Sequence, residues 1–492
     1  MSPSHEAGWA HVEGALRPHH GGPGWLHPPG NPNALVASLW SSTARKSDGD
    51  LVVGGVSVPD LVANVNTPAY ILDEADLRAR ARAFKDAFAG YDIYYAGKAF
   101  LCTTVARWVA EEGLSLDVCS DGELTVALRA GFDPARIGYH GNTKTEMELV
   151  RAVGEGVGRI VVDSFDEIER LARVTSSLRA SGAVSTPQPV MVRVTAGVEA
   201  HTHEYIATAH EDQKFGFSIT SGDALEAVRR VVAAPGLELL GLHSHIGSQI
   251  FDTSGFEVAA RRVLALHALL AHERGVVLPE LDLGGGFGIA YTTQDDPSAP
   301  AVLAAEMSAI VDHECGALGI PRPRLSIEPG RAIVGPAMCT VYTVGTVKRV
   351  ELDGGVVRTY VSVDGGMSDN LRTALYDADY SCTLASRDST APAVLVRVVG
   401  KHCEAGDIVV KDEFLPGDVR PGDLLAVPAT GAYCRSMASN YNHALRPPVV
   451  AVRDGVASTI VRRETVDDLL ATDLGCLDHE DAAVAGASRR SS

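Results

Sequence analysis

Short apolar runs, separated by helical or polar stretches, recur along the first two thirds of the chain. The eight runs between residues 92 and 327 are 92–97, 115–119, 137–140, 159–163, 190–194, 239–244, 280–283 and 324–327. Continuous apolar runs of this length are typical of strands that are buried on both faces. Helical patterns separate most of them, at 103–112, 165–178, 222–233, 255–274 and 301–318.

Strands that alternate with helices predict an α/β fold with a parallel sheet. Eight such units in about 240 residues favour a closed (β/α)8 TIM-type barrel, which we place at residues 73–335. An open doubly wound sheet is the alternative that this pattern leaves open.

Beyond Gly335 the pattern changes to strand-like runs with turn signals and little helix, which predicts an all-β C-terminal domain over residues 336–475. Its expected strands are 340–347, 358–363, 394–399, 407–411, 424–427, 449–452 and 458–462. Ordered structure is expected to begin around Leu51, and runs 52–58 and 68–72 are read as further strands, so segment 34–72 should pack with the β-domain. Residues 1–33, rich in Gly, Pro and His, predict a disordered tail, and residues 476–492 a frayed end.

Composition narrows the class of protein. The chain has 62 acidic and 43 basic residues and a net charge of −19, which disfavours binding to nucleic acid or to an anionic membrane. It has no apolar run of about 18 residues and no signal-peptide pattern at its start. Eight cysteines without a C-x-x-C pair suggest reduced thiols, so we expect a cytoplasmic protein.

Polar residues end nearly every predicted barrel strand. The carboxyl ends of barrel strands surround one mouth, where active sites lie, so these side chains should converge on one pocket. They are Lys98, Ser120, Asp121, His140, Asn142, Asp163, Ser164, Arg193, His245, Gly284 to Gly286 and Glu328.

Lys98 stands out because it follows the buried run 92–95. A lysine at such a place is costly to keep charged, which favours either an ion pair or a covalent bond to an aldehyde. A strand-end lysine whose stem alone is buried is the plain alternative.

Three further motifs carry candidate chemistry. Gly284 to Gly286 could bring backbone N–H groups close to a phosphate, or simply form a tight turn. His243 and His245 share one face; each could be structural, and a His-x-His metal pair is disfavoured because little nearby Cys or carboxylate completes the ligand set. Glu328 needs a cationic partner or a hydrogen-bond donor, which a protonated pyridine nitrogen or an arginine would supply.

An aldehyde-binding lysine, a phosphate loop, a flat imidazole and a carboxylate for a ring nitrogen are together what pyridoxal 5'-phosphate requires. The chain resembles the barrel-type pyridoxal-phosphate decarboxylases, and within them the diaminopimelate decarboxylase family, from about Val53 to Leu470. The resemblance is carried by Tyr-Ala-Gly-Lys-Ala at Lys98, His-Ile-Gly-Ser-Gln at His245, Gly-Gly-Gly-Phe-Gly at Gly284, Glu-Pro-Gly-Arg at Glu328 and Cys-Glu-Ala-Gly-Asp at Cys403. The family often has serine at the position of Ala405.

This resemblance implies a role for each matching residue. Lys98 would bond the cofactor aldehyde, His245 would stack on its ring, and Glu328 would pair with the ring nitrogen. The phosphate would be held by Ser248, Gly286, the backbone of Gly330 and Arg331, and Tyr433. The substrate's distal carboxylate would be held by Arg331, Arg372 and Tyr376, with Tyr433 also at the substrate. Cys403 would donate a proton and Glu404 would accept the distal ammonium, both in the active site of a partner subunit, and no metal is expected.

The activity that the resemblance implies is decarboxylation of meso-2,6-diaminopimelate at its D-centre, giving L-lysine, by a homodimer with shared active sites. Rivals are a decarboxylase of ornithine, arginine or carboxynorspermidine, a pyridoxal-phosphate racemase, and a non-catalytic homologue. Two arginines for a second carboxylate disfavour a decarboxylase of ornithine, arginine or carboxynorspermidine. Glu328 disfavours a racemase, and the presence of Cys403 and the β-domain disfavours a non-catalytic homologue.

Overall fold

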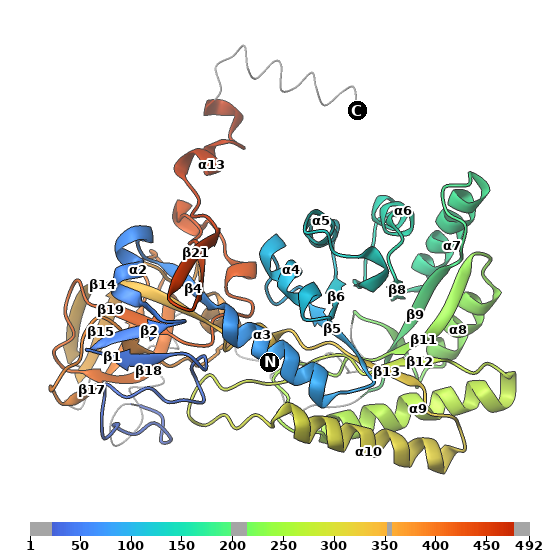
Figure 1. The fold of residues 1–492 in the computed structure, drawn as a ribbon, viewed down its shortest axis with the longest axis horizontal. Coiled ribbons are helices and arrows are strands. Elements are labelled where there is room, and N and C mark those ends of the chain that lie inside the picture. The colour runs from blue at the N-terminus through green and yellow to red at the C-terminus, as the bar shows by residue number, and fades with distance from the viewer. Residues whose placement is uncertain (1–21, 198–213, 352–356, 477–492) are drawn as a thin grey trace.

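The computed structural model describes residues 22–197, 214–351 and 357–476, and its chain forms two distinct parts (Figure 1). One part is a ring of parallel strands surrounded by helices, and the other is a strand-rich region. Most of the two predicted tails lies outside the described residues; segment 22–33 is described and consists of loops and turns.

Eight parallel strands close into a barrel, which confirms the predicted fold class. Each of the eight apolar runs is one of these strands. In order around the barrel they are β5 (Asp92–Ala96), β6 (Ser115–Val118), β7 (Ile137–Tyr139), β8 (Arg159–Val162), β9 (Gln188–Thr195), β11 (Leu237–His243), β12 (Glu280–Asp282) and β13 (Arg324–Ile327). Ile327 of β13 pairs with Ile93 of β5, which closes the ring, and the two-residue strand β10 (Phe217–Ser218) extends β9.

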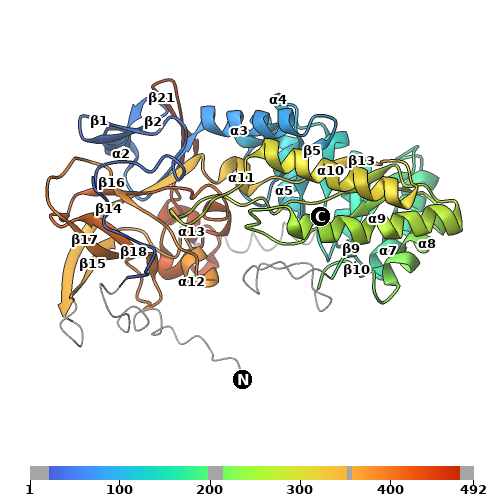
Figure 2. The same ribbon diagram turned by 90° about the horizontal axis from the view of Figure 1, so that it is seen from below.

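Helices cover the outside of the barrel. They are α4 (Thr103–Glu111), α5 (Asp121–Arg129), α6 (Glu146–Glu155), α7 (Phe165–Ala180), α8 (Asp223–Ala233), α9 (Ser254–Arg274) and α10 (Pro300–Leu318). Helix α3 (Glu74–Ala87) precedes the first strand and packs between α10 and α4 (Figure 2). Because β13 leads through the short α11 (Arg331–Val334) into the β region, α3 fills the place in the ring where an eighth helix would lie.

Hydroxyl side chains that follow the strands start several of these helices. Ser120 Oγ accepts the backbone N–H of Glu123, and Ser164 Oγ accepts that of Glu167, which satisfies N–H groups that the first turn leaves unpaired. The expectation that Ser120, Asp121 and Ser164 line the pocket is therefore wrong: they belong to helix starts, and they do not line the cavities at the barrel mouth.

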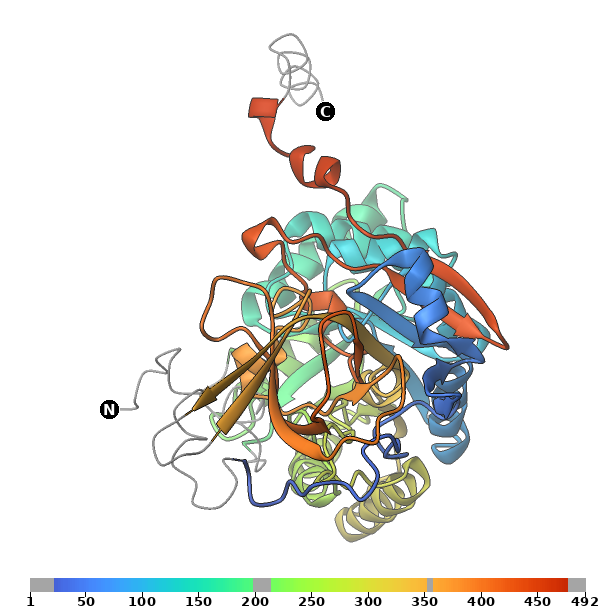
Figure 3. The ribbon, with the colours of Figure 1, turned by 90° about the vertical axis from the view of Figure 1, so that its left-hand side faces the viewer.

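The β region is organised around β14 (Met338–Glu351), which runs on from the barrel. Its larger sheet has the order β18 (Ile408–Pro416), β17 (Ala393–Val399), β15 (Val357–Val363), β14, β4 (Ala69–Asp73), β20 (Val449–Arg453) and β21 (Val456–Val461). Strand β19 (Leu424–Val427) also pairs with β14, and the short β16 (Thr383–Leu384) pairs with β19. Strand β4, from before the barrel, thus lies between β14 and β20 (Figure 3).

The N-terminal segment differs from the sequence expectation in two ways. Order begins before Leu51, because β1 (Arg45–Ser47) is a strand and Leu39 is buried. Run 52–58 is also not one strand: β2 (Asp50–Val53) and the short β3 (Val56–Ser57) give way to helix α2 (Val58–Val65). Ser57 caps this helix and a proline occupies its first turn, a start signal that the apolar run obscured.

The same segment packs on the β region. Leu39, Leu51 and Leu61 share a buried cluster with Val341 of β14 and Val450 of β20. In the described part of the chain, none of the helices has the length and apolar character needed to cross a membrane.

Candidate active site

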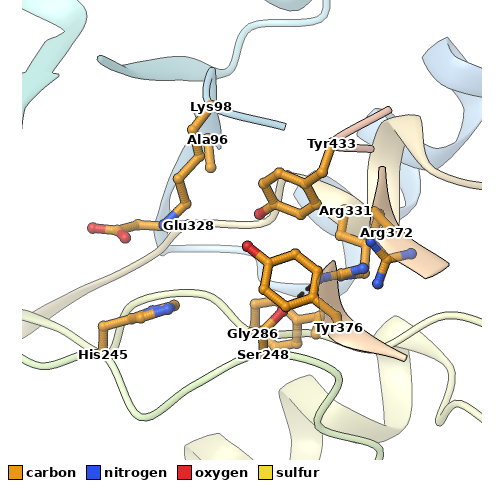
Figure 4. Close-up of a pocket in the computed structure, with 12 residues that line it drawn as sticks. Ala96, Lys98, His245, Ser248, Gly286, Glu328, Arg331, Arg372, Tyr376 and Tyr433 are labelled. Atoms are coloured by element: carbon orange, nitrogen blue, oxygen red, sulfur yellow. Dashed lines mark hydrogen bonds between the residues drawn. The ribbon is translucent and has the colours of Figure 1, made fainter. Parts of the chain in front are cut away.

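Two adjoining cavities, of about 210 and 300 Å³, open at the carboxyl ends of the barrel strands. Both are lined by Ala96, Lys98, His245 and Glu328, so they are two lobes of one site. The lobe toward the β region adds Ser248, Gly286, Gly330, Arg331, Arg372, Tyr376 and Tyr433 (Figure 4). The other lobe adds Asp117, Cys119, His140, Asn142, Arg193 and His243.

Lys98 lies just beyond the end of β5. A turn carries it there, in which the N–H of Gly97 donates to Asp117 O and the N–H of Ala99 donates to Ala96 O. Its side chain is exposed to the site, which corrects the expectation of a desolvated strand-end lysine, and it forms no hydrogen bond or ion pair with the described residues. An amine without a carboxylate partner is available to an aldehyde.

Two loops that follow β11 and β12 are bound to each other beneath the site. Gln249 exchanges two hydrogen bonds with the backbone of Ile289, and the N–H of Ile250 donates to Gly286 O. A side chain at Gly286, where φ is +106°, would place Cβ 2.5 Å from Gly247 O. Only glycine allows the two loops to approach so closely.

Backbone donors gather around these loops. The N–H groups of Gly286, Gly330 and Arg331 have no acceptor among the described residues, and all three residues line the cavity. Unpaired N–H groups at glycine turns and at a helix start are what a phosphate group binds. The hydroxyl of Ser248, which accepts a hydrogen bond from Arg331 at 2.7 Å, lies beside them.

Glu328 directly follows β13 and is only 7% exposed. Its Oε1 lies 3.0 Å from His243 Nε2 and 3.3 Å from His140 Nε2, and His140 Nε2 is also 3.1 Å from Asp117 Oδ1. These four side chains come from four different strand ends. Deeper in the barrel, Arg159 pairs with Asp282 and lies over the Tyr94 ring at 3.7 Å, so its buried charge is compensated inside the barrel.

The protonation of this group follows from its surroundings. Burial raises the pKa of Asp117, and the charge of Glu328 raises it further. Burial alone would raise the pKa of Glu328 too, but His140 and His243 outweigh it, and that pKa is lowered. An added proton therefore resides on Asp117, and Glu328 remains a carboxylate. Burial lowers the pKa of His140 to about 4.

His245 is neutral and fixed in orientation. Burial, with the nearby cations of Lys98 and Arg193, lowers its pKa well below the ordinary value. Its Nδ1 accepts the N–H of Gly285 at 3.1 Å, which assigns the ring proton to Nε2. A neutral flat ring facing the site is suited to stacking against a cationic aromatic ring.

Two buried guanidinium groups face the site from the side opposite Glu328 (Figure 4). Arg331 donates to the hydroxyls of Tyr291 and Ser248, and Arg372 donates to Tyr380 at 2.7 Å. Within the described residues neither forms an ion pair, and the Nε of each is buried without a partner. Buried charges without counterions are costly, so the pair forms an anion site that an external carboxylate can complete.

Tyr433 connects the β region to the barrel. Its N–H donates to Ala99 O, directly after Lys98, and its φ of +66° is uncommon for a tyrosine. Backbone strain of this kind concentrates at functional sites. Helix α12 (Arg372–Tyr376) brings Arg372 and Tyr376 to the same wall, so the β region completes the cavity.

Cys403 and Glu404 do not line the cavity of their own chain. Both are exposed on a loop of the β region. The Asp407 carboxylate holds this loop by accepting the N–H groups of Met367 and His402, while the His402 ring contacts Ser368 and Asn442. The loop therefore presents the thiol and the carboxylate outward.

The structure corrects the argument against a metal pair. A carboxylate, Glu328, and a second imidazole, His140, lie beside His243, and their ligand atoms are within 4.8 Å of one another. The premise that little carboxylate lies near His243 is therefore wrong.

Several residues of the site were missed from the sequence. Tyr291 and Tyr380 hold the two arginines, and Asp117 and Arg159 complete the Glu328 cluster, yet no spacing pattern marked any of them. His140 and His243 carried a signal, since both stand at strand ends, but nothing identified Glu328 as their common partner.

Comparison with known proteins agrees with this geometry. Residues 74–335 match the family model described as "Pyridoxal-dependent decarboxylase, pyridoxal binding domain". The chain is 54% identical over 446 residues to the diaminopimelate decarboxylase of Mycobacterium tuberculosis, covering 89% of this chain and 98% of that one. For the Mycobacterium leprae enzyme of the same name, identity is 52% over 476 residues, with coverage of 96% and 99%. The structure of M. jannaschii diaminopimelate decarboxylase with L-lysine is similar at a TM-score of 0.81 and 28% identity, covering 88% and 98%.

Proposed function

The chain belongs to the pyridoxal-dependent decarboxylases, and on that premise we propose that it removes the D-centre carboxylate of meso-2,6-diaminopimelate to give L-lysine and CO2. The observation that carries the choice of substrate is the pair of buried arginines, Arg331 and Arg372, which lack a carboxylate partner among the described residues. A substrate with a second carboxylate supplies that partner, and a planar guanidinium suits it. The relatives above carry the name of this activity, and one similar structure holds L-lysine.

The residues of the site fit the cofactor of this family. Lys98 would bond its aldehyde, and His245 and Glu328 would contact its ring. Its phosphate would be held by Ser248, Gly286, the backbone N–H groups of Gly330 and Arg331, and Tyr433. Bound there, pyridoxal 5'-phosphate supplies an electron sink for the electron pair that CO2 leaves on the substrate carbon.

The remaining roles belong to side chains that contact the substrate. Arg331, Arg372 and Tyr376, with Tyr433 beside them, would hold the distal carboxylate and so orient the D-centre toward Lys98. Once the carbon–carbon bond breaks, a thiol can return a proton to the carbon, and we assign this step to Cys403. Glu404 would accept the distal ammonium group.

Cys403 and Glu404 would act on the site of a second copy. Their exposure, and their absence from the cavity lining of their own chain, support a homodimer with shared active sites. A fixed loop that presents a thiol and a carboxylate outward has a use when a partner subunit lies against it.

Product analysis tests the proposal. Purified protein with pyridoxal 5'-phosphate is incubated separately with meso-diaminopimelate, LL-diaminopimelate, ornithine, arginine and carboxynorspermidine, and products are separated by chiral chromatography. L-lysine formed only from the meso isomer is the expected result. Product from another amine would move the specificity away from Arg372 and Glu404, and no product from any substrate would leave a non-catalytic homologue.

A further inference from the structure

The Oε1 atom of Glu328 lies close to two histidine side chains. It lies 3.0 Å from His243 Nε2; both atoms are buried, and apart from this close polar contact neither has a hydrogen-bond partner among the described residues. Nε2 of His140 lies 3.3 Å from the same oxygen. The His140 and His243 rings pack edge to face, with their centroids 5.1 Å apart. One carboxylate oxygen is thus enclosed by two imidazoles.

In this arrangement the two oxygens of the Glu328 carboxylate have different surroundings. Oε1 faces the histidines, which leaves Oε2 to face the cavity that Glu328 lines. Imidazole N–H groups can stabilise a carboxylate from one side, whereas an arginine would form a forked ion pair and compete for the second oxygen.

We propose that His243 and His140 are positioning residues for the cofactor ring nitrogen: they hold Oε1 of Glu328, so that an ionised Oε2 is presented to that nitrogen. The inference rests on the placement of Glu328 against the ring nitrogen proposed above. It gives a specific function to His243 and His140, to which the sequence patterns assigned none.

The test compares two probes that differ at one atom. Pyridoxal 5'-phosphate and its analogue with carbon in place of the ring nitrogen share the aldehyde and the phosphate, so the ratio of their affinities isolates the contact with Glu328. Dissociation constants are measured by absorbance in buffer with EDTA, which removes any cation from His140, His243 and Glu328. The variants are His243→Leu, His140→Leu, and His243→Gln as the control that keeps an N–H donor.

Wild-type protein should bind the nitrogen-containing probe tighter by about 10- to 100-fold, the range of one charge-assisted hydrogen bond. His243→Leu should reduce this ratio about tenfold and His140→Leu by a smaller factor, while His243→Gln stays within about threefold of wild type. If His243→Leu does not fold, His140→Leu and His243→Gln still make opposite predictions.

Three results would count against the proposal in different ways. An unchanged ratio in both leucine variants would overturn the role of the histidines, and so would an equal loss of affinity for both probes, which indicates a structural role only. A wild-type protein that does not distinguish the probes would instead refute the placement of Glu328.

Discussion

Replacing Arg372 by methionine should abolish the preference for a substrate with two carboxylates and leave the fold intact. Arg372 is 3% exposed, and its Nε has no partner among the described residues. A hydrogen bond between charged groups contributes about 1.5–3 kcal/mol, more where water is excluded. Loss of about 3 kcal/mol corresponds to a fall in kcat/KM for meso-diaminopimelate of roughly 150-fold.

The matched substrate is D-lysine, which is meso-diaminopimelate without its distal carboxylate. Because D-lysine cannot use the guanidinium, Arg372→Met should leave its slow decarboxylation nearly unchanged, so the ratio of the two kcat/KM values collapses. Arg372→Lys should lose about tenfold, since it keeps the charge without the planar fork.

Stability provides the control for this variant. The guanidinium has no carboxylate partner to strand, and the Tyr380 hydroxyl keeps its contact with Cys434 at 3.6 Å. We therefore expect the free energy of unfolding to change by less than about 1 kcal/mol. An equal loss of kcat/KM for both substrates, with stability unchanged, would show that Arg372 supports the cofactor rather than the distal carboxylate.

Three further predictions follow from other parts of the molecule. Mixing inactive Lys98→Ala and Cys403→Ala proteins should restore about a quarter of wild-type activity after subunit exchange, because half of the dimers then contain one intact site. No recovery of activity would place Lys98 and Cys403 in the site of a single chain. Burial raises the pKa of Asp369 to about 7, whereas an aspartate in the unfolded chain releases its proton near pH 4. Between these two values, the free energy of unfolding should therefore fall by up to about 1.4 kcal/mol for each unit by which the pH rises. Asp369→Asn should flatten this slope in urea titrations. Lys144→Met should lower the free energy of unfolding by about 3–5 kcal/mol, because it leaves the equally buried Glu167, now 2.7 Å from Lys144, without its ion-pair partner. A Lys144→Met, Glu167→Gln double variant that fails to recover stability would contradict this explanation.

The barrel was predictable because its strands are buried on both faces, which makes each of them a continuous apolar run. The same rule failed at Val58, where an apolar run continues from a strand into a helix. There the decisive signal was local, Ser57 followed by Pro59, and hydrophobicity alone could not provide it.

The position of the site was predictable for a topological reason. Strand ends of a parallel barrel meet at one mouth, so Lys98, His245 and Glu328 could be placed together without knowing any distance. Partners that depend on packing were out of reach. Tyr291 and Tyr380 meet Arg331 and Arg372 only because the β region folds back over the barrel, and the exposure of Lys98 reflects a cavity that no linear pattern encodes.

The two parts of the molecule divide the chemistry between them. Lys98, His245, Gly286 and Glu328 all come from barrel strand ends, whereas Arg372, Tyr376 and Tyr433 come from the β region, which is bound to the barrel through Ala99. The isolated barrel would thus retain most contacts to the cofactor but lose the wall that faces the distal end of the substrate. Changes in substrate preference within this architecture are therefore expected to arise at α12 and around Tyr433. With the role proposed above, the Glu328 cluster, enclosed by four strand ends, would constrain the cofactor ring alike for every substrate.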